Sequence, residues 1–215
     1  TRLSAAAVLG LPALDALASG FGYPWKLGII TDQVDLDLGR VLTDFYPRYR
    51  LRWAEIRNLT LGGRPRYVYA DATSGQLKRI KRQLDDAGVQ VSVLDTAVFK
   101  IALPGTRPVA QDLAFANLER SRFGEQIEDL KRAAGAAHAL GAARVRLFTF
   151  LRVAEPAAIF DRIVEQLHRA LEIARQQDIT LLVENEYDCN MGTAAETARL
   201  FRAIPDKRLM HNWDP

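Results

Sequence analysis

Ile179-Thr180-Leu181-Leu182-Val183-Glu184 is the stretch that decides the fold. This apolar run, rich in β-branched residues, ends directly on a carboxylate, and a continuous run of this length predicts a strand buried on both faces, as in a parallel sheet. The segment before it begins at Pro156, a residue suited to the first turn of a helix. Apolar residues then recur at helical spacing at Ile159, Ile163, Leu167, Leu171 and Ala174. A helix therefore leads into the strand.

A second helix and a further strand follow the run. Thr193-x-x-Glu196 has the pattern of a capping box, in which each side chain accepts a hydrogen bond from the other residue's backbone N–H. It predicts a helix that continues through Phe201, and residues 208–213 predict the next strand. The local order is thus helix, strand, helix, strand.

The same alternation runs back toward the N-terminus. Strands are expected at 26–31, 51–57, 89–94 and 144–150, and helices at 38–46, 73–86 and 119–140, with loops at 62–66 and 103–108. Five strand–helix units and a sixth strand indicate a parallel α/β sheet, either open and doubly wound or closed as a (β/α)8 barrel. No Gly-x-Gly-x-x-Gly or P-loop pattern follows any strand, which disfavours dinucleotide and nucleotide binding. A complete barrel takes about 250 residues, so this chain would hold a barrel stopped at its sixth strand.

Composition sets the class of protein. The chain has 215 residues, of which 48% are hydrophobic and 26% charged, and this balance excludes a disordered or low-complexity protein. A single cysteine excludes an intramolecular disulfide framework and a cysteine-rich zinc site. The net charge of +3 is too small to indicate a nucleic-acid partner by itself.

The N-terminal segment has the character of a targeting signal. Residues 5–18 are apolar and small, about the length of a secretory core, and Ala16-Leu17-Ala18 fits a cleavage pattern. The stretch is too short to span a bilayer, which needs about 20 residues. We expect residues 1–22 to be an export signal or an N-terminal extension, and residues 24–215 to be the α/β domain. If the segment is an export signal, the protein is exported to the periplasm. If the segment is instead a helix packed on the domain, the protein is cytoplasmic.

Carboxylates stand at two strand ends. Glu184 follows its apolar run, and Asp214 closes the last strand in the same way. Neighbouring strands lie about 4.8 Å apart, so the two could share a divalent cation, for which carboxylate oxygens are suitable ligands. The alternative is that Glu184 pairs with a nearby arginine and Asp214 caps a helix.

Three short motifs resemble one known family. They are Leu181–Tyr187 with Asn190–Thr197, then Asn212-Trp213-Asp214-Pro215, and Trp53-Ala54-Glu55-Ile56-Arg57. Together they resemble the fifth, sixth and second strands of the sugar phosphate isomerase/epimerase family, in the xylose isomerase-like TIM barrel superfamily. The resemblance runs from Lys26 to Pro215 and implies a (β/α)8 TIM barrel, truncated after strand six.

The resemblance also implies a metal site. In that family the glutamate of strand five and the aspartate of strand six are metal ligands, which makes Glu184 a ligand and acid/base group and Asp214 a second ligand. The implied cofactor is a divalent ion (Mn, Mg, Co or Zn). The family's remaining ligands, a histidine of strand seven and a glutamate of strand eight, would follow Pro215. His211 does not replace them, because its parity along the strand puts it on the opposite face from Asn212.

The reaction implied is proton transfer at a carbon next to a carbonyl, by an isomerase or epimerase acting on a small carbohydrate through an enediolate. Residues at the strand ends are then expected to bind substrate: Glu55, Arg57, Asn58, Asn185, Glu186 and Asn212. For Glu55, Arg57 and Asn58 the alternative is a structural ion pair under the rim of the barrel. We expect no nucleic-acid partner and no membrane span; a homo-oligomer stays open.

Two other functions compete. The run Lys78-Arg79-x-Lys81-Arg82 is the best support for a DNA-repair endonuclease of the apurinic endonuclease IV type. That helix should lie outside the barrel, and no histidine ends an early strand, so a solvated helix face is the preferred interpretation. The third reading is a degenerate barrel that binds a sugar without turnover.

Overall fold

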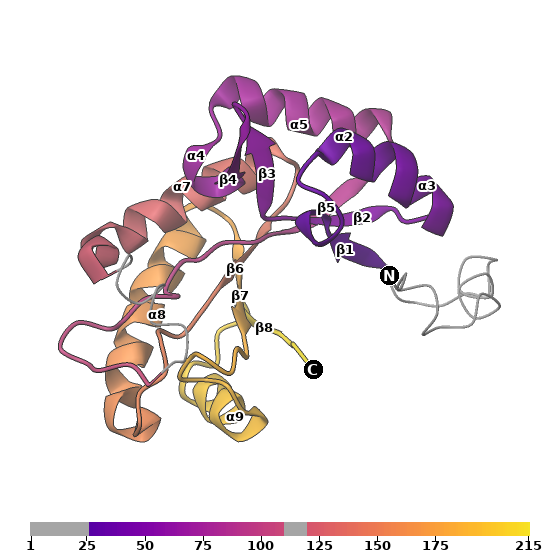
Figure 1. Ribbon diagram of the computed structural model, residues 1–215. Coiled ribbons are helices and arrows are strands. Elements are labelled where there is room, and N and C mark those ends of the chain that lie inside the picture. The colour runs from indigo at the N-terminus through magenta and orange to yellow at the C-terminus, as the bar shows by residue number, and fades with distance from the viewer. Residues whose placement is uncertain (1–25, 110–119) are drawn as a thin grey trace.

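The computed structural model describes residues 26–109 and 120–215 (Figure 1). The predicted export signal at residues 1–22 and the domain boundary after it lie outside the described residues. Among the described helices, none combines the length and the apolar character needed to cross a membrane.

A six-stranded parallel sheet forms the centre of the fold. Its order is β1-β2-β5-β6-β7-β8, so each strand lies beside the next one along the chain apart from a separate hairpin of β3 and β4. The strands are β1 (Gly28–Ile30), β2 (Trp53–Ile56), β5 (Gln90–Leu94), β6 (Arg144–Leu147), β7 (Thr180–Glu184) and β8 (Leu209–Asn212). This sequential parallel order confirms the predicted incomplete TIM barrel.

Helices cover the outer face of the sheet (Figure 1). The longer ones are α5 (Ser74–Asp86), α7 (Gln126–Ala139), α8 (Phe160–Gln176) and α9 (Ala194–Ala203); α2 (Leu38–Arg40), α3 (Tyr46–Tyr49) and α4 (Val68–Asp71) are short. The capping boxes predicted at Thr73 and Thr193 are both present and begin α5 and α9. Gly88 and Gly141 follow α5 and α7 with positive φ, which glycine adopts without strain.

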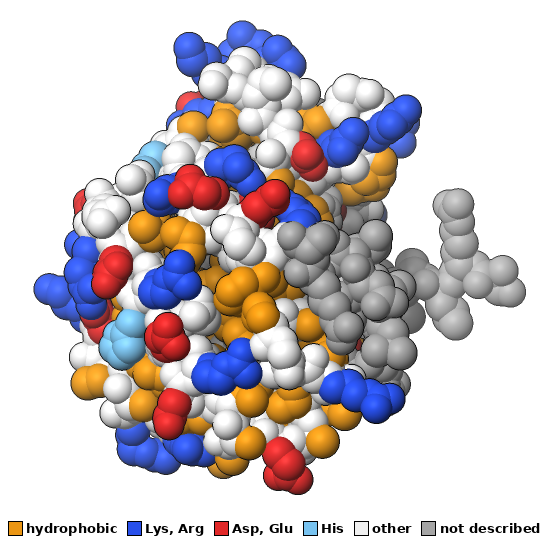
Figure 2. All heavy atoms as spheres, turned by 90° about the vertical axis from the view of Figure 1, so that its left-hand side faces the viewer, with side chains coloured by type: hydrophobic (Ala, Val, Ile, Leu, Met, Phe, Trp, Pro, Cys, Tyr) orange, Lys and Arg blue, Asp and Glu red, His pale blue; other side chains and the backbone are white. Residues whose placement is uncertain are grey.

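The core lies between the outward strand faces and the helices. Val145, Leu181 and Val183 are fully buried, and so are Ile163 and Leu167 of the predicted α8 stripe. On the solvent side of α7 and α8, Figure 2 shows acidic and basic side chains interspersed. The basic residues Lys78 and Arg79 are exposed on α5, as expected for a solvated helix face.

One predicted segment is wrong, and another is helical as predicted but not a uniform α-helix. The loop expected at 62–66 is the turn and second strand of a hairpin, β3 (Asn58–Leu61) and β4 (Arg64–Tyr67). Gly62 and Gly63 both have positive φ, as a tight two-residue hairpin turn requires. The helix expected at 38–46 is interrupted, because a π-helical turn at Val41–Phe45 separates α2 from α3.

Helix starts also differ from the predictions. Pro156 opens a 3₁₀ turn, Pro156–Ile159, and α8 begins after it. A second 3₁₀ segment, Arg120–Glu125, precedes α7. Both are common ways to tighten a helix end, and sequence periodicity does not distinguish them from α-helix.

Candidate functional site

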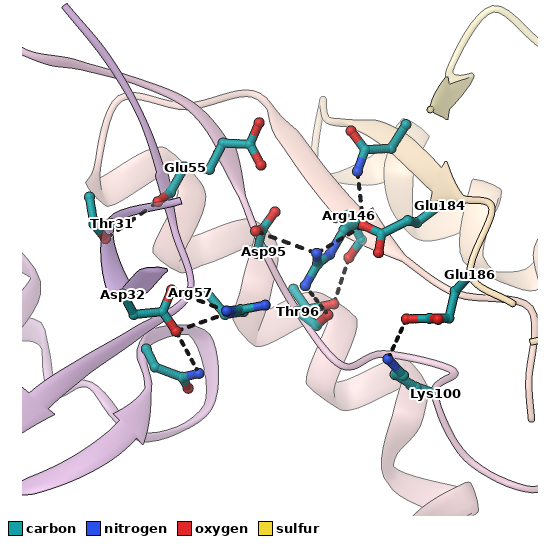
Figure 3. A network of polar contacts seen from close by, with 12 residues as sticks. Thr31, Asp32, Glu55, Arg57, Asp95, Thr96, Lys100, Arg146, Glu184 and Glu186 are labelled. Carbon is teal, nitrogen blue, oxygen red and sulfur yellow. Dashed lines mark hydrogen bonds and ion pairs between the residues drawn. The ribbon is translucent and has the colours of Figure 1, made fainter. Parts of the chain in front are cut away.

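Five polar side chains meet inside the described sheet at the carboxyl ends of its strands. Parallel strands place these ends at one edge, where ligands bind in folds of this class. Figure 3 shows the labelled members from β2, β5, β6 and β7 directed toward a common centre. The five residues, one from each successive strand or its end, are Glu55, Asp95, Arg146, Glu184 and Asn212.

Arg146 and Glu184 form the central ion pair. Nη1 of Arg146 lies 2.8 Å from Oε2 of Glu184, and the Nδ2 group of Asn212 donates to the same oxygen at 2.9 Å. The side chains of Arg146 and Glu184 are only 6% and 9% exposed. The structure thus contains the arginine partner that the sequence left as the alternative for Glu184, and two of the predicted site residues, Glu184 and Asn212, are in contact.

Asp95 is the third member of the centre, and the sequence did not single it out for a role. It is fully buried, and Nη1 of Arg146 lies 3.5 Å from its Oδ2 atom. Burial raises the pKa of Asp95 to about 7; Arg146 lowers it, and the neighbouring Glu55 and Glu184 raise it. Nη2 of Arg146 also donates to the carbonyl of Thr96 at 3.4 Å, which fixes the guanidinium plane.

Glu55 completes the acidic side of the centre. Burial raises the pKa of Glu55; Arg146 lowers it and Glu184 raises it. Unlike Asp95, Glu55 keeps part of its surface exposed. The predicted substrate-binding residue Glu55 therefore lies in the same cluster as the predicted acid/base Glu184, and its role in binding stays a prediction.

Arg57 and Asn58 belong to a second cluster, at the ends of β1 and β2. Nε of Arg57 lies 3.0 Å from Oδ2 of Asp32, and Nδ2 of Asn58 donates to the same oxygen at 3.0 Å. This is the ion pair that the sequence offered as the alternative to substrate binding. The hydrogen bonds connect the turn after β1 to the residue that follows β2 and to the first residue of β3.

Glu186 lies on the rim, paired with a lysine. Nζ of Lys100 is 2.7 Å from Oε2 of Glu186 and 4.7 Å from the ring centre of Phe148. Although burial lowers the pKa of Lys100, its hydrogen bond to Glu186 raises it overall. Lys100 follows the third strand of the sheet, and that position was the signal that could have found it.

Asn185, Asp214 and His211 make a separate contact. Oδ1 of Asn185 accepts from the backbone N–H of Asp214 at 2.8 Å and lies 2.9 Å from Nε2 of His211, whose ring packs on Phe201 of α9. His211 thus faces the helix layer, as its parity predicted. Asn185 contacts the end of β8, and Asp214 contacts it through backbone atoms.

A divalent metal was the predicted cofactor, and its fit can be judged from the donors present. Among residues 26–109 and 120–215, no group of three or more His, Cys, Asp or Glu side chains could hold a metal ion. The guanidinium of Arg146 lies 2.8 Å from one oxygen of Glu184. A metal cation bound to the same carboxylate would be repelled by this positive charge. The described residues alone therefore do not fit a metal centre.

Comparison with known proteins locates the fold in one family. A family model described as xylose isomerase-like TIM barrel matches residues 58–215. No curated protein matches the sequence.

Solved structures show the same fold at low identity. A D-psicose 3-epimerase in the presence of D-fructose is 13% identical, with a TM-score of 0.62 over 88% of this chain and 63% of that chain. A probable 3-DHS dehydratase involved in petrobactin synthesis, from Bacillus anthracis, is 13% identical with a TM-score of 0.61, over 88% and 63%. A xylose isomerase-like TIM barrel protein from Mycobacterium smegmatis, in complex with magnesium, is 14% identical with a TM-score of 0.53, over 82% and 54%. The chain thus spans less than two thirds of the length of these relatives.

Proposed function

This chain belongs to the xylose isomerase-like TIM barrel family, and on that premise we propose that it is an isomerase or epimerase that moves a proton at a carbon next to a carbonyl. The observation that carries the proposal is the setting of Glu184. Within the described part of the chain, Arg146 and Asn212 both donate to Oε2 of Glu184. That leaves Oε1 as the oxygen that takes the substrate proton, while the two hydrogen bonds to Oε2 hold the carboxylate in place.

The electrostatics of the pair favour this chemistry. When Glu184 accepts a proton, its negative charge passes to the oxygen of the enediolate, and the buried Arg146 is left without one of its counter-charges. A fixed cation beside the developing negative charge stabilises the transition state without reorganising. In this proposal Arg146 stabilises the charge that reaches the substrate oxygen, and no step requires Arg146 to release its own proton.

The family relationship supports a carbohydrate-like substrate. The epimerase above was solved with a ketose, and a small carbohydrate or related hydroxy-carbonyl compound fits a centre rich in carboxylate, amide and guanidinium groups. Another structure of the same fold is of a probable 3-DHS dehydratase, so elimination is the competing reaction class. Glu55, Asn212 and Glu186 are the residues we propose to contact the substrate hydroxyls, together with Arg57, Asn58 and Asn185 at the periphery.

A divalent metal ion remains part of the proposal as a cofactor, with Mn, Mg, Co or Zn as candidates. The support is a relative in complex with magnesium and the two carboxylates at strand ends, Glu184 and Asp214. Because the described residues do not form a metal centre, the mechanism above uses only the protein's own groups.

Solvent-isotope exchange tests the proposed reaction. The protein is incubated in D₂O with D-fructose and with hydroxypyruvate, and deuterium at carbon is followed by NMR. We expect deuterium in the recovered substrate and in an isomer or epimer of it. A dehydrated product would instead assign an elimination. Saturable binding with neither exchange nor product would support the sugar-binding alternative.

We also propose that residues 1–22 direct export, which places the protein in the periplasm; without such a signal it is cytoplasmic. Fusing these residues to a reporter that is active only after export separates the two locations.

A further inference from the structure

Lys100 is the cation at the rim of the site, and the mechanism proposed for Glu184 gives it no role. It lies in the segment that follows β5, and its Nζ atom is 2.7 Å from Oε2 of Glu186, which follows β7. Figure 3 shows this ion pair beside the pair of Glu184 and Arg146, at the same end of the sheet. The side chains of Lys100 and Glu186 are 29% and 14% exposed. The pair is therefore partly buried and still within reach of a bound ligand.

A strained turn fixes the position of Lys100. The preceding residue, Phe99, has a φ of 63°, which is unfavourable for a residue with a side chain. Its ring is buried and stacks on Phe150 with 4.7 Å between the ring centres, and its backbone N–H donates to Oε1 of Gln126 at 2.7 Å. Such a conformation persists only where the surroundings determine it, and it is often found at functional sites. The turn buries Phe99 and lets Lys100 reach Glu186.

The ring of Phe148 connects the rim cation to the centre. Phe148 is 2% exposed, and its ring centre lies 4.7 Å from Nζ of Lys100 and 5.0 Å from Cζ of Arg146. A cation within about 6 Å of an aromatic ring centre is attracted to the ring face. The position of Lys100 is thus tied to that of Arg146, whose Nη1 atom donates to Glu184 at 2.8 Å.

The Lys100–Glu186 pair has hydrogen-bonding capacity to spare. Within residues 26–109 and 120–215, the ammonium of Lys100 makes one hydrogen bond, to Oε2 of Glu186, and Oε1 of Glu186 accepts none. An ammonium carries further N–H donors, and a carboxylate oxygen is an acceptor. A donor and an acceptor therefore lie side by side, which is the complement of a hydroxyl group, since a hydroxyl both accepts and donates.

We propose that Lys100 and Glu186 together bind one hydroxyl group of the substrate, and that the site thereby selects a neutral polyhydroxy compound over one with an anionic group at this position. The ammonium of Lys100 donates to the hydroxyl oxygen, and the hydroxyl donates to Oε1 of Glu186. This inference rests on the proposed function only in taking the centre around Glu184 as the substrate site.

The charges of the pair provide the selection. A phosphate that accepts from Lys100 would lie beside the carboxylate of Glu186, which is already 2.7 Å from the same ammonium. A phosphate dianion has no proton to donate to that carboxylate, so two negatively charged acceptors would face each other. Like charges placed together are a common way to reject a wrong ligand. A hydroxyl satisfies both members of the pair and meets no such repulsion.

Binding without turnover tests the proposal. Isothermal titration calorimetry on the full chain compares the neutral ketoses D-fructose and D-psicose with D-fructose 6-phosphate. The wild type should bind a neutral ketose at least about 10-fold more tightly than the phosphate. Lys100→Met should weaken binding of that ketose by about 10-fold or more, because a hydrogen bond to a charged donor is lost. The control Lys131→Met, which removes an exposed ion pair with Glu128 on α7, should keep the wild-type affinities.

Glu186→Gln provides a second, independent variant. It keeps the size of the side chain and removes its charge, which leaves Lys100 free to bind an anion. Binding of D-fructose 6-phosphate should therefore become at least about 10-fold tighter, an effect that loss of a merely structural ion pair would not produce.

Several results would overturn the proposal. They are wild-type affinities in a folded Lys100→Met variant, an unchanged ratio of phosphate to ketose affinity in Glu186→Gln, and a wild type that binds no neutral ketose or binds the phosphate as tightly. Urea unfolding shows which variants are folded, and Glu186→Gln carries the test if Lys100→Met is not. Ketose binding that depends on Lys100 but gives no deuterium exchange would support the hydroxyl contact and count against the proposed reaction alone.

Discussion

Arg146 on β6 reaches forward along the barrel wall to hold Glu184 on β7. The strand register pairs Arg146 with Leu182, two residues before Glu184, yet Nη1 of Arg146 lies 2.8 Å from Oε2 of Glu184. The arginine side chain spans this step between inward-facing positions, which alternate along a strand. Its guanidinium therefore lies level with the three carboxyl groups of the centre.

Removing this cation should be strongly destabilising. In Arg146→Met, Glu184 and Asp95 lose their buried counter-charge, and we expect the free energy of unfolding to fall by about 3–5 kcal/mol. Urea unfolding measures the loss. Arg144→Met is the matched control, because Arg144 lies on the same strand and is exposed; it should change stability by less than about 0.5 kcal/mol. Equal effects of the two variants would contradict a special role for Arg146.

The buried acid should make stability depend on pH. Burial raises the pKa of Asp95 from 3.8 to about 7, so the folded state binds this proton more tightly than the unfolded chain. Its contribution is fully present below pH 3.8 and is lost as pH rises through about 7. Between pH 3.8 and about 7 the free energy of unfolding of the wild type should fall by an amount on the order of 4 kcal/mol, and Asp95→Asn should not show this fall. Urea unfolding at several pH values, taken as the difference between wild type and Asp95→Asn, checks this, and a pH-independent difference would refute it.

The close approach of β1 to β2 gives a prediction about the fold. A Cβ atom at Gly28 would lie 2.7 Å from the carbonyl oxygen of Trp53, so Gly28→Ala should cost about 1–3 kcal/mol through strain. Gly135→Ala is the control, because nothing lies within 4 Å of its Cβ position in α7. That variant should stabilise the protein by about 0.5–1 kcal/mol through a better helix propensity. Thermal unfolding should show a lower unfolding temperature for Gly28→Ala and a higher one for Gly135→Ala than for the wild type.

The cofactor proposal is tested by metal addition. If Glu184 is a ligand, Mn²⁺ or Mg²⁺ should raise the unfolding temperature of the wild type, equivalent to about 2.7 kcal/mol at a free ion concentration about 100 times Kd. Glu184→Ala should lose this shift. The baseline is the unfolding temperature of each protein in metal-free buffer that contains a chelator. A shift of the same size in both proteins would place the ion elsewhere, and no shift in the wild type would argue against a metal cofactor.

Local patterns were sufficient to predict the alternation of strands and helices, whereas the choice of a barrel over an open sheet came from the family resemblance. Apolar runs such as Ile179–Val183 and the capping boxes at Thr73 and Thr193 act within a few residues, and the structure contains them all. The β3–β4 hairpin was missed although Gly62-Gly63 is a turn signal. Its second strand, Arg64–Tyr67, is mostly exposed and lacks the alternation that marks a half-buried strand.

The centre could be predicted only in part. Glu55 and Glu184 were visible as carboxylates at strand ends, but Arg144 and Arg146 look alike in an apolar strand. One is exposed and the other buried because Glu184, 38 residues later, supplies the counter-charge. Such pairings form only once the strands are side by side. The same holds for Asp95, whose contact with Arg146 joins the ends of neighbouring strands.

Deuterium exchange in Glu184→Gln tests the central claim most directly. The glutamine keeps the size of the side chain but cannot accept a proton from carbon, so incorporation of solvent deuterium into the exchanging substrate should fall by about 10²–10⁴-fold. The exposed control Glu165→Gln on α8 should exchange at the wild-type rate. If Glu184→Gln, shown to be folded by its unfolding transition, exchanges deuterium as fast as the wild type, Glu184 is not the base and the proposed mechanism is wrong.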